Sequence, residues 1–470
     1  MKKALAMGLG ALLVAGSAMP ASAASQIDFS GYYNLWFTNV WNQNGGTKDT
    51  QTSWSGFTNR LNLDFAFHAT DEVSVFWRLR APQANKWGDG STYGATTYHA
   101  YGQIKQDWGT ILIGKLADPN FYTGLSNLGW RPDGPDGSGW FTSVNPFDIA
   151  DSAFDGIRYA NRWDNIQLVA QFNRIATGQT SFNSQDGDEA FTDFYLLEGG
   201  YFWDGGGATL GLHYLTDHAT DYPLDHPKYG GSRLNDGAAV KIYYINPAVS
   251  HSFGNGFGIH FEGKYGIGVD DSLDSLPMSK KLSGYAAYLD VDYNYGPGNV
   301  NLAGWYASGE DDNSGDPYAE HKGMVGMGAE FKPLLVAYGD NAGHRGRTTF
   351  GAVAAANEES GTGTGKGAFN ALGSDDSNHW AVALSGNHAF TDDISLSYAI
   401  AKLSLNKVQQ GRDKDIGFEV DLGLQLQLLD NVKLGTAIGY LAAGDALKDS
   451  GSGEAPEDIY AWLSTLTFSF

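Results

Sequence analysis

The sequence predicts an all-β fold, a transmembrane antiparallel β-barrel of about 18 strands. Between residues 418 and 428 apolar and polar residues alternate without exception, so that Phe418 and Val420 belong to one set and Glu419 and Asp421 to the other. A period of two places the two sets on opposite faces of a strand. The pattern recurs along the chain, and the polar segments between its repeats are either short or long. A wall with one apolar and one polar face is typical of a membrane barrel.

The chain begins with a segment that has the properties of a secretory signal peptide. Two lysines precede an apolar run over residues 4–15, and small residues at 21–23 form a cleavage pattern. The apolar run is too short for a comfortable membrane span. We therefore expect a signal peptide at 1–23, export by the Sec route, and a single outer-membrane β-barrel domain at 24–470.

Composition excludes several classes of protein. The formal net charge is −23, and removal of the two lysines of the signal peptide makes it −25, which argues against nucleic acid as a partner. There is no cysteine, so no disulfide stabilises the exported chain. No later apolar stretch reaches the roughly 18 residues that a membrane helix requires. A barrel satisfies its backbone hydrogen bonds between strands instead.

The alternation also sorts the charged residues. Arg or Lys that faces lipid at mid-bilayer costs about 2 to 4 kcal/mol, so the arginines within strands are expected to face the lumen. Arg60, Arg78 and Arg80 all occupy the polar parity of their runs, whereas Phe76 is an apolar exception on that parity. The clearest runs besides 418–428 are 60–67, 73–80, 166–172, 259–265 and 289–295.

The connections between the runs are of two kinds. Short ones carry the Gly, Asn, Asp and Pro residues of tight turns, and the long ones are polar. Short turns on one rim and long loops on the other are the bacterial outer-membrane arrangement, with the short side periplasmic. The short connections are 69–72, 107–109, 161–165, 203–207, 296–298 and 430–431, and the long ones lie near 175–190, 218–235, 268–281, 310–321, 340–377 and 444–456.

Counting hairpins gives about 20 strands, of which one pair is weak. Pro333 in the turn at 331–333 cannot donate to a ladder, and the following run, 334–338, is short for a spanning strand. Without this pair the prediction is 18 strands, with 16 and 20 left open.

The two ends of the mature chain are expected to close the barrel. The first strand is predicted at 27–37 and the last at about 458–470. The last strand ends on Phe470, an aromatic residue of the lipid-facing parity. This ending resembles the C-terminal assembly signal of outer-membrane barrels, which is the role expected for Phe470.

Three segments resemble the general trimeric porins of Gram-negative bacteria. Residues 100–115 resemble a strand-turn-strand signature of that family, with Lys115 in place of the usual Arg. Residues 59–61 are similar to another strand of the family, and residues 156–159 followed by 166–172 are similar to one of its hairpins. The resemblance implies that Arg60, Lys115 and Arg158 form the basic side of a pore constriction. Parity adds Arg78 and Arg80 to this basic wall.

Residues 117–153 form a long stretch without clean alternation, rich in Gly, Pro, Asp and Trp. A loop of this length is usually functional. The resemblance implies a constriction loop folded into the lumen, whose carboxylates face the basic wall, with Asp118, Asp133 and Asp136 as the acidic candidates. Opposed charges across a narrow water column would favour small polar solutes.

Weaker patterns leave other chemistry open. The acidic runs 311–316 and 186–189 offer several oxygens for a loop-bound Ca²⁺, although neither forms a full calcium loop with a closing Glu. No other metal site and no cofactor are expected. Trp130 and Trp140 in the long loop suggest an aromatic path for sugars. No nucleophile is paired visibly with a base, so the protein is not expected to be an enzyme.

As a whole, the mature chain resembles a general porin and is most similar to the homotrimeric porins of sulfate-reducing bacteria. The resemblance implies a homotrimer in the outer membrane, in contact with lipid and lipopolysaccharide, that lets ions and small hydrophilic solutes diffuse passively. Three alternatives stay open: a substrate-specific channel of the sugar type, a barrel enzyme such as a phospholipase or protease, and a soluble secreted adhesin. The sign of the ion selectivity is also open.

Overall fold

A computed structural model gives the fold of most of the chain. It describes residues 26–41, 54–81, 95–116, 154–176, 191–217, 240–270, 280–309, 334–336, 378–408, 411–448 and 457–470. Almost all of these residues lie in strands.

The strands follow one another along the chain, and among the described residues no helix is longer than one turn. They are β1 (Gln26–Trp41), β2 (Trp54–His68), β3 (Val73–Arg80), β4 (Thr96–Gln106), β5 (Gly109–Leu116), β6 (Phe154–Trp163), β7 (Ile166–Ala176), β8 (Phe191–Trp203), β9 (Gly206–Asp217), β10 (Val240–Ser252), β11 (Phe257–Asp270), β12 (Lys280–Asn294), β13 (Gly298–Ala307), β14 (His379–Thr391), β15 (Ile394–Leu405), β16 (Asp415–Leu429), β17 (Val432–Ala443) and β18 (Ile459–Ser469). Asp445–Leu447 forms one 3-10 turn. Among the described residues, no helix has the length and apolar character needed to cross a membrane.

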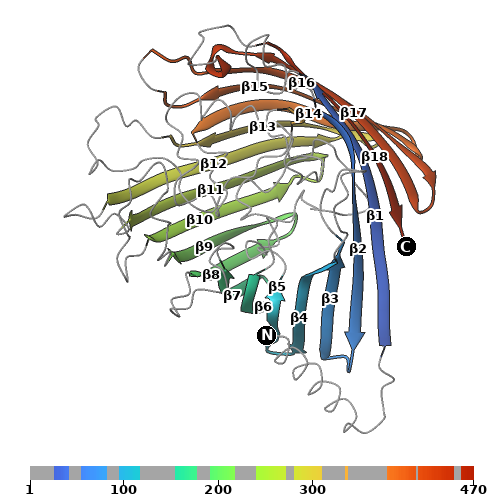
Figure 1. Cartoon of the computed structure of the whole chain (residues 1–470). Coiled ribbons are helices and arrows are strands. Elements are labelled where there is room, and N and C mark those ends of the chain that lie inside the picture. The colour runs from blue at the N-terminus through green and yellow to red at the C-terminus, as the bar shows by residue number, and fades with distance from the viewer. Residues whose placement is uncertain are drawn as a thin grey trace, which may run out of the picture.

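The sheet is a closed antiparallel barrel of 18 strands (Figure 1). Each strand pairs with the next, and β1 pairs with β18 in a register that runs from Tyr32 opposite Ser469 to Trp41 opposite Tyr460. Closure therefore joins the first and the last described strand and leaves no free edge in the sheet. The predicted barrel, its strand number and the pairing of first and last strands are confirmed.

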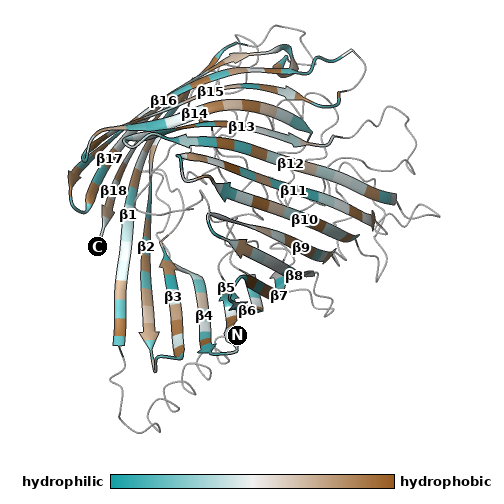
Figure 2. Ribbon diagram, turned by 180° about the vertical axis from the view of Figure 1, so that it is seen from behind, coloured by the Kyte–Doolittle hydropathy of each residue, from teal (hydrophilic) through white to brown (hydrophobic). Residues whose placement is uncertain are grey.

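The alternation in the sequence separates the two faces of the wall. On β16, Phe418 and Leu422 are 42% and 44% exposed, whereas Glu419 and Asp421 are buried at 0% and 1%. Figure 2 shows the same alternation as successive brown and teal bands along the strands. The exposed apolar parity is the outer face of the barrel, and the parity of Glu419 is the inner face.

Aromatic side chains gather at two levels of the outer face. Near the short turns, the ring of Phe65 lies 5.2 Å from that of Phe29 and 5.7 Å from that of Trp77. Near the long connections, rings of Tyr195, Tyr214 and Tyr243 follow one another with centroids 5.9 and 4.7 Å apart. Two aromatic girdles that flank an apolar band are typical of barrels that span a bilayer.

The short connections are tight turns at one rim, as predicted. The turn between β8 and β9 uses Gly205 at φ 78°, and the turn between β6 and β7 uses Asp164 at φ 50°. Gly adopts this left-handed backbone without steric cost, and Asp tolerates it better than most residues. The residue types that predicted the hairpins are therefore the ones that the turn geometry requires.

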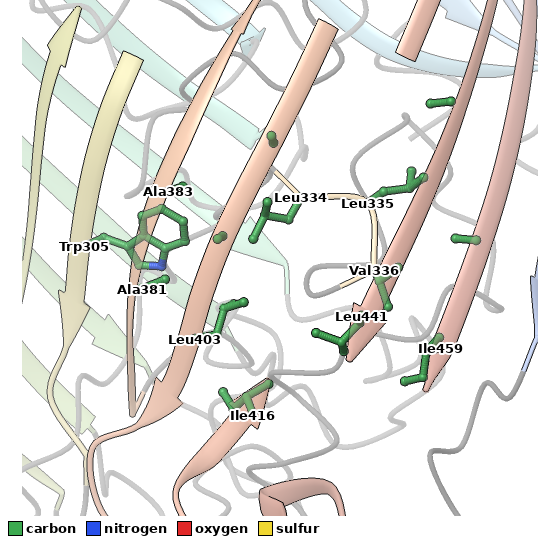
Figure 3. Packing of buried hydrophobic residues seen from close by; sticks show 14 of the residues in the cluster. Trp305, Leu334, Leu335, Val336, Ala381, Ala383, Leu403, Ile416, Leu441 and Ile459 are labelled. Atoms are coloured by element: carbon green, nitrogen blue, oxygen red, sulfur yellow. The ribbon is translucent and has the colours of Figure 1, made fainter. Parts of the chain in front are cut away.

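The inner face of β13 to β18 carries an apolar cluster that includes a segment from outside the strands (Figure 3). Leu334, Leu335 and Val336, from the connection between β13 and β14, are buried against this wall. The segment is not a strand, which agrees with the exclusion of the weak pair near Pro333 from the strand count. It lies inside the barrel.

Candidate functional site

The candidate functional site is the charged inner wall of the barrel, and its basic part begins on β2. Arg60 is 1% exposed and lies opposite Asn34, whereas its neighbours on the other parity face outward. Its guanidinium carbon lies 5.4 Å from the ring centroid of Trp36, within cation–π range. Parity alone predicted the inward direction of Arg60, and the register agrees.

Two further arginines face inward from β3. Arg80 donates from Nε to Oδ1 of Asn62 at 3.0 Å, and its guanidinium carbon lies 3.4 Å from the ring centroid of Tyr98. Arg78 donates from Nε and Nη2 to the two carboxylate oxygens of Asp64, at 2.6 and 2.9 Å. Each arginine is therefore held in a defined orientation by a side chain of a neighbouring strand.

Phe76, the apolar exception on the inward parity, has a partner in this part of the wall. Its ring stacks on that of Tyr101 on β4, with centroids 5.1 Å apart. Tyr101 in turn lies within the electrostatic range of Arg78 and Arg158. The stacked pair therefore packs beside the inward arginines and explains why an apolar residue occupies a lumen-facing position.

Arg158 extends the basic wall to β6. It lies between Leu112 on β5 and Gln171 on β7 in the ladder, while its neighbour Ile157 is 51% exposed on the outer face. The charge of Arg158 reaches Glu198 on β8. The basic wall of this barrel thus spans β2 to β6, and it meets a carboxylate at its far edge.

The structure corrects the prediction for Lys115. The side chain follows the parity of Ile113, which is exposed on the outer face, and Leu116 beside it is buried. Its Nζ donates to the backbone oxygen of Thr97, whose hydroxyl accepts a hydrogen bond from the exposed Trp77. Lys115 therefore belongs to the parity of β5 that faces outward, whereas the arginines of the basic wall face inward.

An acidic and mixed-charge region follows on β8 to β11, and the sequence reasoning did not single it out as a site. Glu198 and Glu262 are inward, buried and close enough for their charges to interact. Lys264 lies with Nζ 5.0 Å from the ring centroid of Tyr244, and its charge reaches His213. Strand parity predicts that Glu262 and Lys264 face inward. Their neighbours on the inner wall depend on the register between strands, which the sequence does not give.

Several predicted features lie outside the described residues. They are the signal peptide at 1–23, the constriction loop at 117–153 with Asp118, Asp133 and Asp136, the aromatic residues Trp130 and Trp140, and the acidic runs 186–189 and 311–316. In the part of the chain that the structure describes, no three His, Asp or Glu side chains are grouped so as to hold a metal ion. These features remain predictions.

Phe470 lies where the barrel closes. Its backbone exchanges two hydrogen bonds with Gly31, of 2.8 and 3.0 Å, and its ring lies 5.8 Å from that of Phe29 on the exposed outer face. The terminal residue is therefore part of the closing ladder. Its role as an assembly signal remains a prediction.

Comparisons with known proteins agree with this geometry at the level of the fold. No family model and no curated protein sequence matches the chain.

Solved structures match over nearly all of the chain. OccK9 (OpdG) of Pseudomonas aeruginosa has 12% sequence identity and a TM-score of 0.53, with 95% of this chain and 99% of that chain covered. OpdL of the same organism has 10% identity, a TM-score of 0.51 and coverage of 95% and 99%. OccK2 (OpdF), in complex with glucuronate, has 13% identity, a TM-score of 0.50 and coverage of 95% and 98%. The chain therefore has the fold of an outer-membrane β-barrel channel.

Proposed function

We propose that the protein is a channel of the bacterial outer membrane through which ions and small hydrophilic solutes diffuse passively. The observation that carries this proposal is the sorting of charge by strand parity. Arg60, Arg78, Arg80 and Arg158 face the inside of a closed barrel whose outer face is apolar. The charges of these arginines set the electrostatic potential that ions and polar solutes meet inside the barrel.

The arrangement of the charges suggests how such a channel would select its solutes. The arginines of β2 to β6 and the carboxylates of Glu198 and Glu262 lie on adjoining parts of the inner wall. Opposed charges along a confined water column orient polar solutes and disfavour apolar ones. The arginines attract anions locally, and the effect is strongest where the water column is narrowest.

The test is ion selectivity in planar bilayers. The wild-type protein should form ohmic channels, and replacing Arg60 and Arg158 together by Gln should shift the reversal potential in a salt gradient toward cations. Lys115→Gln removes one positive charge from the outward side of the same region and should leave the reversal potential unchanged. Failure of the purified, folded protein to form channels would refute the proposed function.

A substrate-specific channel for anionic sugars is the second candidate. Arg80 is held by both Asn62 and Tyr98, and an oriented guanidinium beside an aromatic ring suits a solute that has a carboxylate and a sugar ring. The similar structure OccK2 is a complex with glucuronate. Saturable block of the current by glucuronate, with glucose as the neutral control, would support this candidate. A current that glucuronate does not block would support general diffusion.

The remaining inferences concern the setting of the channel. We infer a homotrimer in contact with outer-membrane lipid and lipopolysaccharide from the resemblance to the general porins, and secretion from the N-terminal segment. Electrophoresis of the unboiled outer-membrane fraction tests the trimer and the secretion. Presence of the protein in this fraction would support secretion, and a large band that changes to the size of a single chain on heating would support a trimer. We also infer that the protein has no enzymatic activity, which assays of lipase and protease turnover on the purified protein would test.

A further inference from the structure

One part of the inner wall is lined by very small residues. On β14, β15, β17 and β18 many inward positions carry side chains of one carbon atom or none: Ala381, Ala383, Ala399, Ala401, Ala437, Gly439 and Ala461. We call this surface the small-residue wall. The alanines are buried at 7% exposure or less, so other groups cover the wall.

The segment Leu334–Val336 covers it from the inside. The three residues are 0%, 8% and 2% exposed, and Figure 3 shows them beside the strands that carry Leu403, Leu441 and Ile459. The fit is close at Gly439, where an added Cβ would lie 3.1 Å from Cβ of Leu335. Any larger residue at position 439 would compete with Leu335 for space.

Two carboxylates of β16 hold the backbone of the same segment. The N–H of Leu335 donates to Oδ2 of Asp421 at 3.1 Å, and the N–H of Val336 donates to Oε1 of Glu419 at 2.6 Å. Both carboxylates are buried. Two such hydrogen bonds on consecutive amides fix the position and the direction of the segment.

We propose that Leu334–Val336 is a fixed wedge that narrows the pore from the side of β13 to β18 and so sets the largest solute that passes. The proposal rests on the proposed channel function and adds a size-determining element to it. Polar solutes gain nothing from an apolar surface, so the wedge also confines their path to the charged wall of β2 to β11. Glu419, Asp421 and Gly439 are then positioning residues for the wedge.

The first test removes the two carboxylates. In the variant Glu419→Ala with Asp421→Ala, the wedge loses both hydrogen bonds, and neutral sugars of graded size should enter proteoliposomes up to a larger molecular size than with the wild type. Single-channel conductance in 1 M salt, where surface charge is screened, should rise by about 1.5-fold or more, because a wider water column conducts more. Asp292→Ala, which removes another inward carboxylate from β12, is the control and should leave both readouts unchanged.

The second test restores the wedge covalently. The protein has no cysteine, and the 3.1 Å between Cβ of Leu335 and an added Cβ at position 439 is close to the roughly 3.5 to 4.5 Å that a disulfide spans. Adding Leu335→Cys and Gly439→Cys to the double-alanine variant should return the size limit to that of the wild type under oxidising conditions. Reduction should widen the pore again.

The outcomes separate the proposal from the function on which it rests. A wild-type protein that forms no channel refutes the proposed function. Folded, heat-modifiable double-alanine protein with the wild-type size limit overturns the wedge, and so does a cross-linked variant that stays wide when oxidised. If the double-alanine variant does not fold, Leu334→Ala with Leu335→Ala keeps the carboxylates and reduces the bulk of the wedge. An unchanged size limit in that variant would also overturn the proposal.

Discussion

Arg78 and Asp64 form a two-pronged ion pair across β2 and β3, in which Nε and Nη2 of the guanidinium donate to the two oxygens of the carboxylate at 2.6 and 2.9 Å. Both side chains keep about a quarter to a third of their surface exposed. The pair is therefore formed at the inner surface of the barrel, where Asp64 offsets part of the field of Arg78.

Asp64→Asn should make the channel more anion-selective. The substitution keeps the size of the side chain and removes the negative charge that offsets Arg78, so the local potential becomes more positive. The reversal potential in a KCl gradient should move toward the anion limit at low salt and less at high salt, because added salt screens the charge. Asp71→Asn, in an exposed turn, is the control for loss of one negative charge. Equal shifts from both variants would contradict a specific role for the Arg78–Asp64 pair.

A positive charge on the outer face of β16 should destabilise the barrel. Leu422 lies at the middle of the strand on the exposed apolar face, so Leu422→Arg should cost about 2 to 4 kcal/mol of the free energy of unfolding in lipid. Gln425→Arg places the same charge on the inward parity of the same strand and should cost much less. Urea unfolding in lipid vesicles, followed by tryptophan fluorescence, measures both. Equal costs would contradict the assignment of the two faces.

Deletion of Phe470 should impair closure of the barrel more than Phe470→Ala, which removes only the ring. Deletion of the residue removes the two backbone hydrogen bonds to Gly31 together with the contact to Phe29, whereas Phe470→Ala keeps the backbone. The fraction of heat-modifiable folded protein during refolding in detergent, which contains no assembly machinery, should fall most for the deletion. If Phe470 is an assembly signal, Phe470→Ala should lower the amount of folded protein in cells as much as the deletion does. Normal amounts of folded protein from Phe470→Ala in cells would remove the signal role.

Gly31→Val should also block closure. A Cβ at Gly31 would lie 2.5 Å from the backbone oxygen of Asn62 and 2.8 Å from the ring of Phe470, so a branched side chain forces the backbone apart at the seam. We expect a lower yield of folded barrel and a lower melting temperature in detergent. Gly102→Val is the matched control, because a Cβ there meets nothing within 4 Å. A melting temperature for Gly31→Val equal to that of the control would contradict the close packing at the seam.

The ion pair between Arg174 and Asp193 should stabilise the end of β7 and the start of β8, where the long connection 177–190 joins them. Both guanidinium-to-carboxylate bonds are short, at 2.8 and 2.9 Å, and the Asp193 side chain is 8% exposed whereas that of Arg174 is 52% exposed. Arg174→Met leaves the carboxylate of Asp193 without this guanidinium and should cost about 1 to 2 kcal/mol, less than for a fully buried pair. Arg174→Lys should recover only part, because the fork geometry is lost. Urea unfolding of both variants measures the difference.

Much of the wall follows from the sequence, because strand parity is a local property. The alternation at 418–428 predicts the two faces of β16, and the same counting places Arg60, Arg78 and Arg80 inward, as the structure has them. Tight-turn residues predict which strands are neighbours. Together these local features lead to the correct number of strands.

The rest depends on contacts between segments far apart in the chain. The resemblance to the general porins predicts Lys115 on the basic wall, but the register with β4 and β6 places it outward. Glu419 and Asp421 were correctly placed on the inner face, yet they hold backbone amides about 85 residues away along the chain instead of lining open water. Three apolar residues after a proline carry no periodic signal that would reveal such a packing site.

Closure between β1 and β18 also has a consequence for how the chain folds. The ladder joins residues separated by more than 400 positions. Bringing such distant residues together costs more conformational entropy than pairing strands that are neighbours in sequence, so this ladder should form last. Until the C-terminal strand is synthesised, every intermediate sheet has two open edges that can pair with other chains. The incomplete sheet is therefore prone to aggregate, and pairing of β18 with β1 removes that hazard.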